Sequence, residues 1–249
     1  METKLNVKKD NIKRVIPVLS GKGGVGKTIV AVNLALALSD LGNKVGLLDV
    51  DIHGPNVPLM LNIEENNLVQ KNNKLIPIDY KTKDNKIKIM SSWFLQENKN
   101  EAVIWRGPLK HKLIQEFFDK VKWDDLDYLI VDFPPGSGDE SISFSQVIET
   151  KLDTEMKSVI VTQPQKLSLK DAEKSVDFCR KSNIEIAGII ENMSGIFGEN
   201  NAKKLAEKYN LNYFGTIPMS EDYIKESENN KIEVKEEFIE IAKELDNQF

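Results

Sequence analysis

The sequence predicts a three-layer α/β fold, in which a doubly wound, mostly parallel sheet carries helices on both faces. Short apolar runs of strand length alternate along the chain with longer stretches whose apolar residues recur at helical spacing. Several of the runs are almost wholly apolar, as strands are when helices cover both faces of the sheet. The first run leads through a glycine-rich turn into the first helical stretch, which is typical of a doubly wound sheet with a ligand at its carboxyl edge.

The length predicts one domain. The chain of 249 residues is enough for a single α/β domain with a substantial core, and it is short for two. We therefore expect one domain over residues 1–249. Its first residues are polar and rich in lysine, so residues 1–12 are expected to form a flexible N-terminal arm.

The first half of the chain contains two strong strand signals. Val15–Leu19 is apolar and ends at the glycine-rich turn, and Ile29–Leu41 follows as a helix with Gly42 as its stop signal. Val45–Val50 is the second buried strand. Asn62–Asn85 is polar and rich in Asn and Lys, which predicts an irregular connection or a hairpin.

The second half repeats the alternation of strand and helix. Lys86–Met90 alternates as a strand does, Leu109–Val121 has apolar residues every three or four positions, and Tyr128–Val131 is nearly all apolar. The same patterns predict strands at Ser158–Thr162, Ile186–Ile190 and Tyr213–Ile217, and helices at Leu167–Ser182, Ala202–Tyr209 and Glu233–Leu245.

Charge and composition exclude several classes of partner. Lys and Arg total 34 and Asp and Glu total 39, so the net charge of −5 argues against a dedicated nucleic-acid binder. There is one cysteine, which suits a reducing compartment. No apolar run approaches the roughly 18 residues of a membrane span. We expect a soluble cytoplasmic protein with neither nucleic acid nor membrane as a partner.

The glycine-rich turn carries a phosphate-binding motif. Gly21–Thr28 reads GKGGVGKT and matches G-x-x-x-x-G-K-T between a strand and a helix. Its glycines allow backbone N–H groups to surround phosphate oxygens, Lys27 is expected to reach the β- and γ-phosphates, and the Thr28 hydroxyl is expected to bind Mg²⁺. A glycine-rich turn without a ligand is the alternative, which the strand–helix context disfavours. The predicted contacts with ATP within the motif are Gly21, Gly23, Gly24, Val25, Gly26, Lys27 and Thr28.

Acidic residues lie where two of the predicted strands end. Asp49 and Asp51 lie on the same side of the second strand at its carboxyl end, where one can hold the water shell of Mg²⁺ and the other can orient an attacking water molecule. Asp132 follows the apolar strand Tyr128–Val131 in the Walker B pattern and is expected to hold Mg²⁺, in part through water. The predicted metal ligands are Thr28, Asp49 and Asp132.

Lys22 and several longer segments carry a resemblance to a known family. A second lysine in the form GKGGVGKT marks the deviant Walker A ATPases, which include MinD- and ParA-type proteins and the nitrogenase iron protein. Within this class the chain resembles the Mrp/ApbC-type iron–sulfur cluster carrier ATPases over residues 12–245. Four segments carry the resemblance most strongly: Ser20–Thr28 (SGKGGVGKT), Leu47–Pro58 (LLDVDIHGPNVP), Trp105–Pro108 (WRGP) and Asp132–Asp139 (DFPPGSGD). Two weaker ones agree: Val159–Gln165 (VIVTQPQ) and Ile189–Ser194 (IIENMS).

The resemblance implies roles for particular residues. It implies a homodimer in which Lys22 crosses to the partner's nucleotide and stabilises the transferred phosphoryl group. It makes Asp51 the residue that positions water, so that Lys22, Lys27 and Asp51 form the catalytic set. It implies that Asn192 contacts adenine and that Pro218 lies beside the base pocket. Arg106 is expected near the nucleotide face.

The chain departs from the family in two places. Ile29, which is also a predicted nucleotide contact, stands where the family usually carries a second hydroxyl, so one hydrogen bond to the α-phosphate is missing. The family's C-x-x-C pair is also absent, because Gly195–Gly198 follows Ser194 directly. Cys179 lies among apolar residues on a predicted helix and is expected to be a small buried hydrophobe.

His53 and His111 have no neighbours at metal-ligand spacing and are expected not to bind metal. A 4Fe–4S cluster, which the family would lead one to expect, takes four thiolates, so we expect no stable cluster on this chain.

Three functions follow from these observations. The leading hypothesis is a homodimeric, Mg²⁺-dependent ATP hydrolase that acts in iron–sulfur cluster assembly with client or scaffold proteins. The first alternative is a nucleotide-gated adaptor that carries no cluster. The second is a positioning ATPase of the MinD or ParA type, against which the DFPPGSGD segment and the absence of a basic terminal helix both argue.

Overall fold

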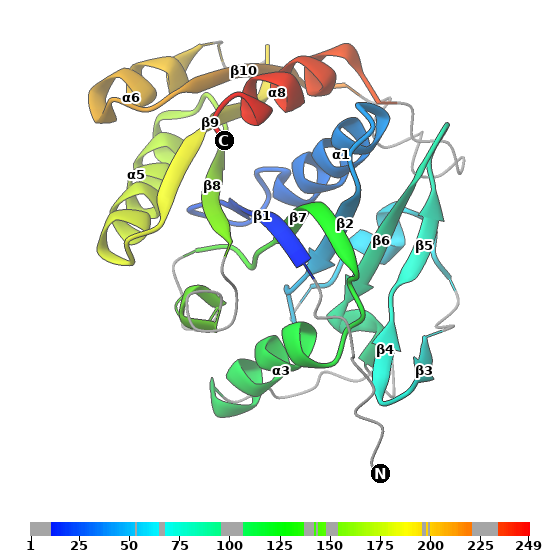
Figure 1. Ribbon diagram of the computed structural model, residues 1–249. Helices are drawn as coiled ribbons and strands as arrows, with labels where there is room; N and C mark the ends of the chain where they lie inside the picture. The colour runs from blue at the N-terminus through cyan, green and yellow to red at the C-terminus, as the bar shows by residue number, and fades with distance from the viewer. Residues whose placement is uncertain are drawn as a thin grey trace.

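The computed structural model describes the chain in ten stretches, and its architecture is the predicted α/β sandwich (Figure 1). The stretches are residues 11–52, 54–64, 68–95, 107–136, 142, 144–147, 154–195, 198, 200–220 and 234–249. The main sheet has eight strands in the order β10-β9-β8-β1-β7-β2-β6-β5. All neighbouring pairs in it are parallel except β5 with β6. The predicted doubly wound, mostly parallel sheet is confirmed.

Every strand and helix that the sequence patterns predict is present, with bounds shifted by a few residues. The strands are β1 (Asn11–Leu19), β2 (Val45–Asp49), β3 (Val69–Lys71), β4 (Lys74–Ile76), β5 (Ile78–Lys81), β6 (Lys86–Ser91), β7 (Asp125–Asp132), β8 (Glu155–Thr162), β9 (Glu185–Ser194) and β10 (Tyr213–Pro218). The helices are α1 (Lys27–Asp40), α2 (Val57–Met60), the 3₁₀ helix η1 (Ser92–Leu95), α3 (Gly107–Asp119), α5 (Lys166–Lys181), α6 (Asn201–Tyr209) and α8 (Glu236–Asp246).

Several strands begin earlier than the apolar patterns indicate. β1 begins at Asn11 and β7 at Asp125, and these two residues are partners in the ladder. Their side chains are exposed or half-buried at the amino edge of the sheet, so the hydrophobic pattern does not mark them. Of the predicted N-terminal arm, residues 1–10 lie outside the described part, and residues 11–12 belong to β1 instead.

The polar connection after α2 contains a hairpin, one of the two predicted forms. β3 and β4 pair antiparallel around Asn72 and Asn73, whose φ angles of 50° and 63° are those of a two-residue type I′ turn. The patterns did not predict β5, which joins the edge of the main sheet antiparallel to β6. Its alternating, half-exposed residues differ from the apolar central strands.

Helices cover the sheet on both faces. α1 packs against β1, β2 and β7 and against α8, whereas α5 packs against β8 and β9 and α6 packs against β9 and β10 (Figure 1). The predicted apolar face of α8 is part of the core, since Phe238, Ile241, Ala242 and Leu245 are all buried. Within the described stretches, no helix is both long and apolar enough to cross a membrane.

This topology gathers the carboxyl ends of the central strands at one edge. Val18 of β1, Asp132 of β7 and Asp49 of β2 lie side by side in the ladder. The glycine-rich turn follows β1 at the same edge. The sheet register therefore brings the phosphate-binding motif and the two acidic strand ends together.

Candidate functional site

The glycine-rich loop is pressed between β9 and α5. A Cβ atom at Gly26, whose φ is +80°, would lie 2.1 Å from Nδ2 of Asn192. A Cβ atom at Gly21 would lie 1.9 Å from the carbonyl oxygen of Asp171 in α5. Real Cβ atoms are not found so close to other atoms, so packing favours glycine at both positions, and the backbone conformation favours it at Gly26 as well.

The loop surrounds a hollow of about 220 Å³ at the start of α1. Seven of the predicted nucleotide contacts line it, together with Lys22 and Asp51, the two predicted catalytic residues that lie outside that set. Backbone N–H groups at a helix start favour a bound anion, so the hollow suits phosphate. The complete lining is Ser20, Lys22, Gly23, Gly24, Val25, Gly26, Lys27, Thr28, Ile29, Asp51, Asn56 and Pro135.

A buried ion pair lies beside this hollow. Lys27 Nζ donates to Asp132 Oδ1, and the Thr28 hydroxyl donates to Asp132 Oδ2 at 2.7 Å. The side chains of Lys27 and Asp132 are only 7% and 1% exposed. Burial raises the pKa of Asp132, and the opposing influence of Lys27 and Thr28 does not cancel it. The predicted phosphate lysine and two predicted Mg²⁺ ligands thus form one cluster.

The carboxylates of Asp49 and Asp51 lie in different surroundings, although the sequence predicts both at the end of one strand. Asp51 lines the hollow, and its Oδ1 accepts from the Gly54 amide at 3.1 Å. Asp49 ends β2, is wholly buried and is absent from the lining of the hollow. Its carboxylate accepts from the Val57 amide at 3.2 Å and from the Ser91 hydroxyl at 3.0 Å. Burial, with the nearby charge of Asp132, raises the pKa of Asp49 well above its usual range.

The segment after β7 joins the site to the neighbouring core. Pro135 lines the hollow, and the Gly136 amide donates to the Ser20 carbonyl at 2.9 Å. Phe133 is buried with its ring edge-on to that of Phe144, with centroids 4.5 Å apart. A shift of Asp132 would therefore be felt by a helical segment that includes residues 144–147. Residues 137–139 of this predicted loop lie outside the described stretches.

Two side-chain amides approach the loop from β8 and β9. Asn192 Nδ2 donates to the Val25 carbonyl at 2.8 Å. Gln163 Nε2 donates to the Gly24 carbonyl at 3.1 Å, a contact that no sequence motif predicts. Its position directly after the apolar run of β8 was the available signal, because strand ends meet at this edge. Pro218 is exposed at the end of β10 and pairs with Ser194 in the ladder, and it does not line the hollow.

Cys179 is buried, as predicted. Its thiol lies 3.4 Å from the Ser158 hydroxyl, between α5 and β8, and burial raises its pKa to about 11. A thiol with such a pKa is almost entirely protonated at neutral pH, and the thiolate is the form that binds metal. His111 lies 3.1 Å from the side chain of Gln115 on α3. His53 and Arg106 lie outside the described residues.

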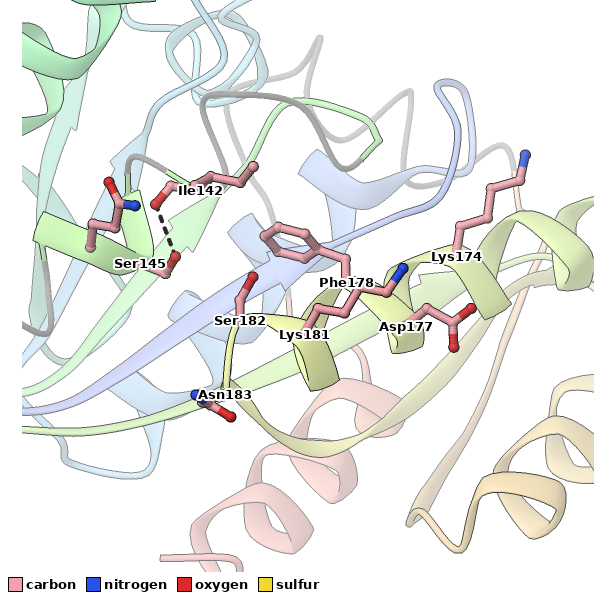
Figure 2. A pocket seen from close by; sticks show the side chains of 9 residues that line it. Ile142, Ser145, Lys174, Asp177, Phe178, Lys181, Ser182 and Asn183 are labelled. Carbon is pink, nitrogen blue, oxygen red and sulfur yellow. Dashed lines mark hydrogen bonds between the residues drawn. The ribbon is translucent and has the colours of Figure 1, made fainter.

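A second, larger hollow of about 700 Å³ lies between α5 and the segment around Ser145 (Figure 2). It contains none of the predicted site residues. None of the residues that line it is a glycine, so it contains no glycine-rich loop. The smaller hollow is therefore the candidate functional site. The larger one is lined by Ile142, Ser145, Gln146, Lys174, Asp177, Phe178, Lys181, Ser182 and Asn183.

A family model and the curated relatives of this chain agree on one kind of protein. The model of the NUBPL iron-transfer P-loop NTPases, within the ParA group, matches residues 11–248. The "Cytosolic Fe-S cluster assembly factor Nubp2 homolog" of Anopheles gambiae is 43% identical over 221 residues, with 84% of each chain covered. The protein of the same name from Drosophila virilis is 44% identical over 222 residues, covering 84% of this chain and 82% of its own.

Two solved structures share the fold. A nucleotide-binding protein from Archaeoglobus fulgidus, solved in complex with ADP, has a TM-score of 0.77 at 33% identity and covers 91% of this chain and 90% of its own. The cell division ATPase MinD of Pyrococcus furiosus has a TM-score of 0.69 at 22% identity, covering 94% of this chain and 98% of its own. At that identity, the second likeness concerns the fold alone.

The close approach of Asn192 to Gly26 yields a test in paired variants. Gly24→Ala and Gly26→Ala both place alanine at a positive φ, +77° and +80°, but a Cβ at Gly24 meets nothing within 4 Å. We expect Gly24→Ala to cost about 1–2 kcal/mol from backbone strain alone. Gly26→Ala should cost about 1–3 kcal/mol more, because Asn192 must leave the Val25 carbonyl. Urea unfolding measures both values, and equal costs would contradict the packing argument.

Proposed function

Because the chain belongs to the NUBPL iron-transfer P-loop NTPase family, we propose that it binds and hydrolyses Mg·ATP at the glycine-rich loop and acts in iron–sulfur cluster assembly. The observation that carries the proposal is the cluster of Lys27, Thr28 and Asp132 at the edge of the phosphate hollow. The relatives named as cytosolic iron–sulfur cluster assembly factors support the biological role and a cytosolic location.

The nucleotide would be held by parts that are already gathered. The N–H groups of the loop and the charge of Lys27 would bind the phosphates. The Thr28 hydroxyl and the carboxylates of Asp132 and Asp49 would serve Mg²⁺, Asp49 only through water because it is buried away from the hollow. All of these metal contacts are oxygen donors, which hard cations prefer. Asn192 and Pro218 would lie toward the base, and Ile29 would contact the α-phosphate side without a hydroxyl.

Binding would also change the partners of Asp132. Lys27 and Thr28 both donate to this carboxylate in the present arrangement. Phosphate and Mg²⁺ compete for the same two groups, so loading exchanges these bonds. Because Phe133 and Pro135 follow directly, the exchange would be transmitted into the loop that contacts Ser20 and Phe144. This gives the ATPase a conformational output for a client or scaffold protein.

Catalysis would need two further groups. Asp51 lines the hollow and would position the attacking water molecule. Lys22 also lines it, but half-exposed, and would act across the interface of a homodimer on the partner's phosphate. A homodimer also fits the cluster-assembly role, since a two-fold axis brings equivalent surfaces together.

The second candidate function is an adaptor that carries no cluster, which the buried thiol favours. Cys179 is the only cysteine and lies inside the α5–β8 packing. In this version the chain hydrolyses ATP and changes the conformation of a partner, and the partner holds the cluster. The MinD or ParA type of positioning role has less support, because the net charge is acidic and the exposed face of α8 is rich in glutamate.

Substitution of Lys27 and Asp51 tests the nucleotide site. Lys27→Ala should weaken Mg·ATP binding about a hundredfold or more, since it removes the charge nearest the β- and γ-phosphates. Asp51→Ala should keep binding within about threefold and lower turnover by about 10²–10⁴, because only attack on the γ-phosphate needs oriented water. Calorimetry and phosphate release measure the two effects, with the exposed Lys44→Ala as the control. Unchanged hydrolysis in Asp51→Ala would remove its assigned role.

The trans role of Lys22 is tested by mixing variants. Lys22→Ala and Asp51→Ala should each be inactive alone, but a mixed dimer contains one complete site. Turnover of an equimolar mixture should approach about a quarter of the unaltered rate, because half of randomly paired dimers carry one such site. Steady-state ATPase assays and light scattering measure this recovery and the dimer. A monomer with full activity would refute the trans role.

Anaerobic reconstitution tests whether the chain binds a cluster. With iron and sulfide followed by desalting, we expect no stable 4Fe–4S cluster, because a dimer offers one buried thiol per chain where four thiolates are needed. Iron and sulfide analysis and the visible absorbance measure the outcome, with Cys179→Ser as the matched variant. Retention of about four irons and four sulfides per dimer, surviving Cys179→Ser, would show that other ligands serve.

A further inference from the structure

Two side-chain amides hold consecutive carbonyl groups of the phosphate loop. Gln163, directly after β8, donates from Nε2 to the Gly24 carbonyl at 3.1 Å. Asn192, near the end of β9, donates from Nδ2 to the Val25 carbonyl at 2.8 Å. Both side chains are buried or nearly so, with exposures of 9% and 3%. The loop is thus fixed from behind by adjacent strands of the sheet.

Because each peptide is planar, these contacts also fix the direction in which the loop N–H groups point. In a trans peptide the C=O and the following N–H point in opposite directions across the C–N bond. A fixed Gly24 carbonyl therefore fixes the direction of the Val25 N–H, and a fixed Val25 carbonyl does the same for the Gly26 N–H. Val25 and Gly26 both line the phosphate hollow. The two amides face the loop carbonyls, so these N–H groups are directed away from the amides.

The Gln163 side chain is itself held in place. Its Nε2 also lies 2.9 Å from the sulfur of Met193, and its Oε1 accepts from the Ser168 hydroxyl at 3.4 Å. The oxygen end of the amide is therefore directed to α5, and the nitrogen end is directed to the loop. A residue that only filled space at this position would need neither orientation.

We propose that Gln163 is a positioning residue for phosphate binding, which keeps the Gly24–Val25 peptide turned so that its N–H faces the bound phosphates. The inference rests on the proposed nucleotide function. It assigns to Gln163 a role through the loop backbone and not through contact with the nucleotide. The amide is required because glutamine alone combines this reach with a neutral N–H donor, whereas a carboxylate would set an acceptor against the Gly24 carbonyl.

Loss of the Gln163 donor should affect the binding of the phosphates and not that of the base. The loop N–H groups cradle the α- and β-phosphates, while the base and ribose lie elsewhere. Loss of the Gln163 donor lets the Gly24–Val25 peptide rotate, and this weakens the contacts with the phosphate chain. AMP lacks the β-phosphate and makes fewer of those contacts, so its affinity should change less than that of Mg·ADP.

The test compares Mg·ADP with AMP by calorimetry on Gln163→Met. Methionine keeps the length and removes the donor. The dissociation constant for Mg·ADP should rise about three- to tenfold, as expected for one lost hydrogen bond, while that for AMP stays within about twofold. Gln165→Met is the matched control, because Gln165 lies two residues on at the start of α5 without a side-chain capping bond. It should leave both constants unchanged.

Gln163→Glu supplies a second variant in case the methionine variant does not fold. At pH 7.5 it should weaken Mg·ADP at least as much, since an acceptor then faces the Gly24 carbonyl. Equal losses of Mg·ADP and AMP affinity would mean a merely structural role and would overturn the proposal. So would unchanged Mg·ADP affinity in a folded variant, beside an unaltered chain that binds normally. Failure of the unaltered chain to bind Mg·ADP would overturn the proposed function and this inference together.

Discussion

The site is organised around one buried carboxylate, that of Asp132. It ends β7 between β1 and β2 and is 1% exposed. A carboxylate so placed is costly unless it is paired, and removing one partner of a buried pair typically costs about 3–5 kcal/mol. Lys27 and Thr28 are its partners, and they can reach it only if the glycine-rich loop closes tightly and α1 begins at Lys27. The conformation of the loop and the acidic strand end therefore depend on each other.

This dependence also makes the site able to switch. Lys27 cannot pair fully with Asp132 and with a γ-phosphate at the same time. A ligand that binds the lysine therefore weakens the Lys27–Asp132 ion pair. The pair is connected through Phe133 to Phe144 and through Gly136 to Ser20. In the proposed function, an exchange of these bonds would be transmitted through these two contacts to the neighbouring segments.

The extent to which the sequence predicts this structure follows from how local each signal is. The glycine-rich loop and Asp132 were predicted because each is a short motif next to an apolar strand. The early start of β1 and the edge strand β5 were not, since their side chains are partly exposed and the period of the hydrophobic pattern is lost there. Gln163 could not be assigned a role, because its partner is a backbone carbonyl 139 residues away along the chain. Asp49 was expected beside Asp51, but β2 ends between them and only the register and the buried Ser91 reveal where its carboxylate lies.

The chain lacks the cysteine pair but keeps the nucleotide site, and this combination is compatible with membership of the family. Gly195 follows β9 at once, so the chain passes from the end of that strand without the segment that would present thiolates. Cys179 cannot take over, since its thiol faces Ser158 in the interior and its raised pKa disfavours the thiolate. Meanwhile the glycine-rich loop, Asp51 and the Lys27–Asp132 pair are all present, and the pair holds buried charge, which is costly to maintain. A chain that keeps the charged residues of the nucleotide site but not the cysteine pair fits the proposal that it acts on a cluster-bearing partner. The energy of ATP binding would then be used to change a protein–protein contact and not to hold iron directly.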